Sequence, residues 1–154
     1  MLGASEIAVV VAMMVQTGVD LPPKEVGCMA QNIYHEARGE SIDGQLAVAH
    51  VTYNRVQSSR FPDSVCDVVV HDKGPAPYDC QFSWTCDGKS DRARDVEAFA
   101  LAVLLSIEVM TRRAEDLTQG AQFYVAKSAL NRRWVRNLEP VGKIGRHFFM
   151  RRRS

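Results

Sequence analysis

One segment of this chain has to be buried, because residues 96–107 are apolar at almost every position. A helix that is apolar on all its sides is stable only when other elements surround it. We therefore expect a buried central helix that begins near Ser90 and Asp91 and ends near Arg113. The other elements of the 154-residue chain must then be arranged around this helix.

Two amphipathic patterns, one on each side of Gly39, predict a pair of helices that meet at a tight corner. Apolar residues recur at helical spacing before and after this glycine, at Val26, Met29, Ala30, Ile33 and Ala37, and then at Ile42, Leu46, Ala49, Tyr53 and Val56. A glycine just past a helix end commonly takes a positive φ, which we expect for Gly39. The corner carries two carboxylates, Glu36 and Glu40.

The position of Glu36 makes it a candidate general acid. On a helical wheel Glu36 lies at the margin of the apolar stripe, within about one turn of the helix C-terminus. The helix dipole and partial burial both disfavour a negative charge there, so they should raise the pKa of Glu36. A raised pKa suits a general acid near neutral pH. The alternative is that both glutamates are solvated and pair with Arg38 or Arg55, since most acidic residues are exposed.

Residues 1–20 predict one more helix. Residues 7–15 are almost entirely apolar, and Ser5 can cap the helix while Glu6 lies in its first turn. The apolar run is too short to span a bilayer and lacks the basic flank of a secretory signal. We expect a first core helix that ends near Gly18, with a weak signal-anchor or membrane-disturbing role as the alternative.

The remaining segments predict short elements and loops. We expect a short element over residues 65–70, capped by Asp63 or Ser64, and then an irregular loop over residues 71–79. An extended segment should follow over residues 121–126, and Ser128 should cap a short helix that contains Trp134. A closing hairpin is expected over residues 141–150, with Gly142 and Gly145 at its turns. The pattern predicts an α+β fold that is mainly α, in a single domain spanning residues 1–154.

Four cysteines, Cys28, Cys66, Cys80 and Cys86, allow two disulfides, one or none. A bridge from Cys80 to either Cys66 or Cys86 would fasten a loop that is poor in apolar residues, and would suit a periplasmic protein. In a reducing cytosol all four would remain thiols. The absence of a C-x-x-C pair disfavours a zinc site, and we expect neither a metal nor another cofactor.

Composition and motifs exclude several classes of protein. The formal net charge of +1 gives no general attraction to nucleic acid. An H-E-x-x-H zinc motif begins at His35 but fails, because Gly39 stands at its fifth position, and no G-x-S-x-G occurs. The last quarter of the chain is basic, which is consistent either with capture of an anionic polymer or with a solvated tail and a polar helix face.

The pattern Y-H-E-A-R-G-E-S-x-x-G-Q-x-A-V-A-x-V-x-x-N-R over residues 34–55 resembles the signature of the SleB-like cell-wall hydrolases, which cleave peptidoglycan. The resemblance continues in the family's order through residues 61–66, 81–84, 120–121 and 144–149, and it covers about residues 26–150. It implies a lysozyme-like domain with a buried central helix and a small β-hairpin, to which residues 1–20 add a helix.

The resemblance also implies site residues. The glutamate proposed as the catalytic acid in that family corresponds to Glu36. By its position at the same corner, Glu40 is the candidate second carboxylate, with a role in fixing the corner as the alternative. Substrate-binding residues are expected at Tyr34, Gln81, Ser83, Trp84, Tyr124 and His147. Trp84 has a core anchor as its alternative role, and His147 a structural one. The family often has Tyr-His where this chain has Tyr124 and Val125, so a catalytic histidine is not expected there.

The implied activity is cleavage of the β-1,4 bond between N-acetylmuramic acid and N-acetylglucosamine, by a muramidase or a lytic transglycosylase. A non-catalytic peptidoglycan-binding module and an amidase-type hydrolase are the alternatives. We expect a monomer that binds glycan strands, with no nucleic-acid partner and no stable membrane span. A phage endolysin, made in the host cytoplasm and released to the wall by a hole-forming holin, fits these features.

Overall fold

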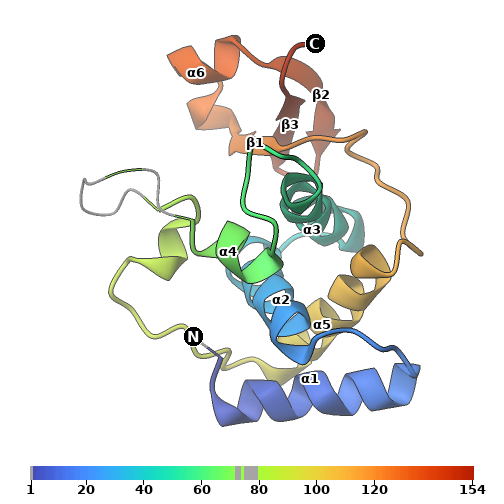
Figure 1. Cartoon of the computed structure of the whole chain (residues 1–154). Helices are drawn as coiled ribbons and strands as arrows, with labels where there is room; N and C mark the ends of the chain where they lie inside the picture. Colours follow the sequence, from blue (N-terminus) through green and yellow to red (C-terminus); the bar gives the residue numbers. More distant parts are fainter. Residues whose placement is uncertain (1, 72–73, 75–79) are drawn as a thin grey trace.

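A computed structural model describes residues 2–71, 74 and 80–154 (Figure 1). Its helices are α1 (Ala4–Thr17), α2 (Pro23–Ala37), α3 (Ile42–Val56), α4 (Val65–Val69), α5 (Val96–Met110) and α6 (Arg133–Arg136), and its strands are β1 (Phe123–Ala126), β2 (Glu139–Ile144) and β3 (His147–Arg151). Two 3₁₀ turns, η1 (Ser83–Thr85) and η2 (Lys127–Ala129), complete the elements of the described residues. Most of the expected irregular loop over residues 71–79 lies outside the described residues.

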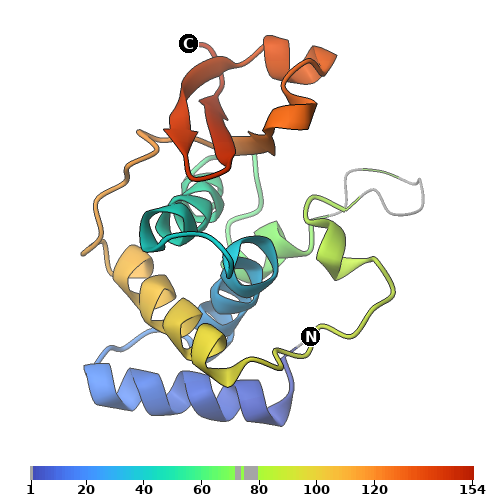
Figure 2. The same cartoon turned by 180° about the vertical axis from the view of Figure 1, so that it is seen from behind.

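Helix α5 packs against α1, α2 and α3, and α2 contacts α1, α3, α4 and α5 (Figures 1 and 2). Phe99, Val103 and Ile107 of α5 are fully buried, which confirms that this helix belongs to the core, while Val96 at its start is exposed. The helix begins at Val96 and ends at Met110, so the expected start near Ser90 and Asp91 is wrong.

The late start of α5 has a tertiary cause. The Ala93 N–H donates to the buried carboxylate of Glu6 at 3.0 Å, and the Asp95 N–H donates to the Tyr34 hydroxyl at 3.1 Å. These bonds hold the backbone before Asp95 against α1 and α2 in a non-helical conformation. Asp95 then caps the helix by accepting from the Ala98 N–H.

Helix α1 begins two residues earlier than expected, because its N-cap is Gly3 rather than Ser5. The Glu6 carboxylate reaches back to the Gly3 N–H at 3.1 Å. Gly18 ends the helix in a left-handed conformation, at the expected position. None of the helices in the described part of the chain is long and apolar enough to cross a bilayer.

The corner between α2 and α3 forms without a left-handed residue at Gly39, which corrects that expectation. The Glu40 N–H donates to the carbonyl of Ala37 at 2.8 Å, so the chain turns immediately after α2. Ser41 then caps α3 by accepting from the Gly44 N–H at 3.2 Å. The two helices therefore meet within four residues, with Glu36 in the last turn of α2.

The strands form an antiparallel sheet in the order β1-β3-β2, so the expected hairpin gains a third strand from the extended segment before it. Gly145 takes a positive φ of 59° in the turn between β2 and β3. Gly142 lies inside β2 next to an irregularity in the ladder, not at a turn as expected. One face of the sheet packs on α3 through Phe149, and the other packs on α6 through Met150.

The cysteines form two disulfides. Cys28–Cys66 ties α2 to α4, and Cys80–Cys86 closes the loop that contains η1, which is one of the two pairings expected for Cys80. Ser64 caps α4, as one of the two expected residues. Ser128 does not cap the helix of Trp134, because it lies within η2 and α6 begins after Arg132.

Candidate active site

A small cavity of about 210 Å³ lies where α2, α3, β1 and the loop before η1 converge. Its walls consist of Glu36, Arg55, Cys80, Gln81, Phe82, Ser83 and Tyr124. These residues come from distant parts of the sequence, and the packing of the sheet on α3 brings Tyr124 to the end of α2. The cavity therefore places one carboxyl group beside one buried cation and several polar side chains.

Glu36 is held in this cavity by a short hydrogen bond. Its Oε2 accepts from the Tyr124 hydroxyl at 2.7 Å. Burial raises the pKa of Glu36, while the bond from Tyr124 and the charge of Arg55 act in the opposite direction, and the net shift is upward. Burial and the neighbouring carboxyl group keep the pKa of Tyr124 well above its usual value, so the phenol remains the donor.

Arg55 is a fully buried cation, with only 2% of its surface exposed. Its Nε donates to the carbonyl of Gln122 at 2.7 Å, and the Gln81 amide oxygen, when oriented toward the guanidinium, accepts from Nη1 and Nη2 at 3.0 and 3.1 Å. Burial lowers the pKa of Arg55 to about 10, with Tyr124 and Glu36 opposing that shift. The group therefore remains charged at neutral pH.

Three aromatic rings complete the surroundings of this guanidinium. Its central carbon lies 5.3 to 5.6 Å from the ring centres of Phe61, Phe82 and Phe123. Stacking of this kind suits a delocalised cation and excludes water from it. Sequence reasoning missed this role of Arg55, although the residue ends the N-R pair of the recognised motif.

Glu40 lies in a different environment. Its Oε1 accepts from Arg146 Nε at 2.8 Å and lies 3.9 Å from His147 Nδ1. Partial burial opposes ionisation, but the hydrogen bond and charge of Arg146, with the charge of His147, lower the pKa of Glu40 overall. Glu40 is not among the residues that line the cavity. It connects the α2–α3 corner to the β2–β3 turn.

The other expected site residues divide into two groups. Gln81, Ser83 and Tyr124 line the cavity, and the His147 ring meets the Tyr124 ring edge-on at 4.9 Å. Tyr34 and Trp84 lie outside the cavity lining. Their roles as substrate-binding residues stay predictions, and their contacts in this structure are with the protein.

The contacts of Tyr34 and Trp84 fix elements around the site. The Tyr34 hydroxyl accepts from Asp95 at the start of α5. Trp84 Nε1 donates to the buried Asn32 side chain at 3.0 Å, and its ring stacks on His35 at 4.4 Å. Trp84 thus anchors η1 to α2 and positions the Gln81 wall of the cavity. Among the described residues, no group of His, Cys, Asp and Glu is suited to holding a metal ion.

A comparison with protein families identifies the chain. Residues 39–150 match the family model described as Cell Wall Hydrolase. The chain belongs to this family. The expected relationship to SleB-like enzymes is therefore confirmed. The matched segment begins just after Glu36.

The chain is also similar to several proteins named spore cortex-lytic enzymes. The one from Halalkalibacterium halodurans is 32% identical over 125 residues, which make up 81% of this chain and 34% of that protein. The one from Bacillus subtilis is 29% identical over 130 residues, 81% of this chain and 37% of that protein. The chain thus spans little more than a third of the length of these relatives.

Two solved structures have the same fold. The catalytic domain of Bacillus cereus SleB is 30% identical with a TM-score of 0.66, over 86% of this chain and 93% of that one. The catalytic domain of the germination-specific lytic transglycosylase SleB from Bacillus anthracis is 29% identical with a TM-score of 0.63, over 85% and 97%. These likenesses confirm the mainly helical, lysozyme-like α+β fold.

Proposed function

We propose that this protein is a lytic transglycosylase that cleaves the β-1,4 bond between N-acetylmuramic acid and N-acetylglucosamine in peptidoglycan, with Glu36 as its acid and base. The observation that carries the proposal is the cavity beside Glu36, in which this residue is the one carboxylate among the described lining residues. Its raised pKa supports a protonated donor.

The number of carboxylates bears on the reaction type. Most glycosidases that use water need two carboxyl groups flanking the bond, one as acid and one as base or nucleophile. Here the expected second carboxylate, Glu40, is held by Arg146 and lies outside the cavity lining. A single carboxyl group instead suits a reaction in which the substrate supplies its own nucleophile.

The proposed reaction uses Glu36 twice. Its proton goes to the glycosidic oxygen as the bond to the anomeric carbon of the muramic residue breaks. The Glu36 carboxylate then accepts the proton of the muramic 6-hydroxyl while that oxygen bonds to the anomeric carbon. The product is a 1,6-anhydro sugar, no water is consumed, and Glu36 returns to its protonated form.

Arg55 and Tyr124 support this cycle. The buried charge of Arg55 and the hydroxyl of Tyr124 both favour the ionised form of Glu36, which exists only between the two proton transfers. They oppose part of the effect of burial, so the carboxyl group both gives up and regains a proton. We assign them as positioning and charge-stabilising groups around the acid.

Fragment analysis of digested sacculi tests this proposal. Purified peptidoglycan is incubated with the protein, and the released muropeptides are weighed by mass spectrometry. We expect anhydro ends, each lighter by one water than a reducing end, and none with Glu36→Gln. Reducing ends would show a hydrolase and overturn the transglycosylase assignment. Binding to sacculi without release would show a binding module and overturn the enzyme.

The site of action follows from the same proposal. The two disulfides support action in a compartment outside the reducing cytosol, which is where peptidoglycan lies. Release to the wall by a holin, as a phage endolysin, stays a prediction, as does the monomeric state.

A further inference from the structure

Positive and negative charges are concentrated in different parts of the chain. We call residues 119–154, with the sheet and α6, the sheet lobe, and residues 1–118 the helical lobe. The sheet lobe has nine Lys or Arg and one Glu, a net charge of +8, and the helical lobe has ten Lys or Arg and seventeen Asp or Glu, a net charge of −7. A formal charge of +1 for the whole chain conceals this division.

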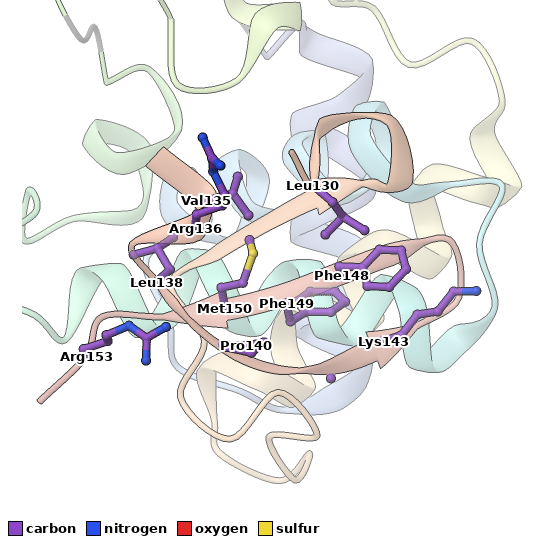
Figure 3. A pocket seen from close by; sticks show the side chains of 11 residues that line it. Leu130, Val135, Arg136, Leu138, Pro140, Lys143, Phe148, Phe149, Met150 and Arg153 are labelled. Carbon is purple, nitrogen blue, oxygen red and sulfur yellow. The ribbon is translucent and has the colours of Figure 1, made fainter. Parts of the chain in front are cut away.

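The sheet lobe also has an apolar pocket of about 470 Å³, between the sheet and the segment from η2 to α6 (Figure 3). Leu130, Leu138, Phe148 and Met150 form its floor and walls. This volume lies within the range of pockets that bind small ligands. The pocket is separate from the Glu36 cavity, with which it shares no lining residue.

Three cations surround this apolar floor. Figure 3 shows Arg136, Lys143 and Arg153 around its edge, on different sides. Lys143 Nζ lies 5.5 Å from the centre of the Phe148 ring. In the part of the chain that the structure describes, no carboxylate is in ion-pair contact with these three side chains, and Glu139 is paired with Arg151.

An exposed aromatic residue lies beside the pocket. Trp134 of α6 is 45% exposed and stands between Arg133 and the pocket residue Val135. Tryptophan flanked by basic residues is typical of surfaces that lie in the interface of a bilayer. A polyanion alone would account for the charge but not for the apolar floor, and a neutral apolar ligand would not account for the three cations.

We propose that the pocket is a binding site for an anionic membrane lipid. One acyl chain lies along Leu130, Phe148 and Met150, and the head group lies among Arg136, Lys143 and Arg153. The exposed side chains of Arg132 and Arg133 face neighbouring head groups, which is why a bilayer rather than a free fatty acid is the fitting source. This site would hold the protein at a membrane surface while the separate cavity acts on the wall. It does not depend on the proposed function.

Sedimentation with lipid vesicles tests the proposal, using the full chain without peptidoglycan. We expect binding to vesicles that contain phosphatidylglycerol and none to pure phosphatidylcholine, and binding should weaken with salt. The double variant Arg136→Gln, Lys143→Gln should bind about 30-fold more weakly, at roughly fivefold for each basic residue removed. The matched control is Lys89→Gln, Arg94→Gln, which removes the same charge from the helical lobe and should bind as the wild type does.

Gly142 allows the pocket itself to be tested without a change in charge. It lines the pocket, its φ is not positive, and a Cβ added there meets nothing within 4 Å. Gly142→Phe should therefore fill the pocket, keep the fold as judged by circular dichroism, and weaken binding to anionic vesicles. Equal binding by Gly142→Phe would show a polyanion surface and overturn the lipid site. Equal binding to both kinds of vesicle would overturn it as well.

Discussion

Two glutamates four residues apart in the sequence have opposite environments, and the difference shows how the corner between α2 and α3 works. Glu36, in the last turn of α2, is half-buried against Tyr124, and its pKa is raised. Glu40, just beyond the turn, is paired with Arg146, and its pKa is lowered. The first is suited to chemistry, and the second joins the helices to the sheet.

Removal of the two carboxyl groups should give the largest contrast. Glu36→Gln keeps the shape of the side chain but has no proton to transfer, so release of muropeptides should fall by about 10²- to 10⁴-fold. Glu40→Gln should retain activity within about tenfold of the wild type, since Glu40 positions the turn and does not line the cavity. Turbidity loss of sacculi measures both variants, and equal losses would break the comparison.

Removal of the Tyr124 hydroxyl should shift the pH dependence of the acid. Because its hydrogen bond lowers the pKa of Glu36, Tyr124→Phe should raise that pKa. The alkaline limb of the activity profile should then move to higher pH, with a smaller loss of maximal rate than for Glu36→Gln. Tyr53→Phe, outside the cavity, serves as the control. An unchanged or more acidic limb in Tyr124→Phe would contradict the assigned proton donor.

The β2–β3 turn that faces Glu40 offers a test of the structural role of Glu40. Gly145 has a φ of 59°, and a Cβ there would lie 2.5 Å from Glu40 Oε2. Gly145→Ala should lower the free energy of unfolding by about 1–2 kcal/mol, the cost of a left-handed residue with a side chain. Gly142→Ala in the same hairpin should be nearly neutral, since that position has space and no positive φ. Urea unfolding of both variants decides the point.

The smallest expected effect is on the stability of the fold, which Glu36→Gln should raise and Glu40→Gln should lower. A raised pKa favours the protonated form in the folded state, so Glu36 destabilises the fold as pH rises above 4.5. Glu36→Gln should therefore become more stable to heat than the wild type as the pH rises above 4.5. Glu40 has a lowered pKa, so its stabilising contribution is fully present above the usual pKa of 4.5 and is lost as the pH falls through the lowered value. Glu40→Gln should be slightly less stable at pH 7, and equal to the wild type at low pH.

Features that depend on neighbouring residues could be predicted from the sequence, and features that depend on distant contacts could not. The helical period alone places Glu36 at the edge of a buried stripe near a helix end, and both features are present. The partners of Arg55 lie far along the chain, at Gln122 and Phe123, so no local pattern indicated that this cation is buried.

The errors in element boundaries have the same explanation. Ser90, Asp91 and Asp95 are all acceptable caps for α5, and only the distant contacts of Glu6 and Tyr34 select Asp95. Gly142 and Gly145 are alike in sequence, but the strand register makes one a strand residue and the other a turn. The disulfide from Cys28 to Cys66 likewise depends on how α4 packs on α2.

The most direct test is a titration of the glutamate carboxyl carbons by ¹³C NMR, with the signals of Glu36 and Glu40 assigned from the two Gln variants. The account predicts that Glu36 loses its proton at a pH above the usual range for glutamate, and that Glu40 loses its proton below that range. If Glu36 titrated at or below the pH of Glu40, the surroundings of Glu36 would not favour its protonated form, contrary to this account.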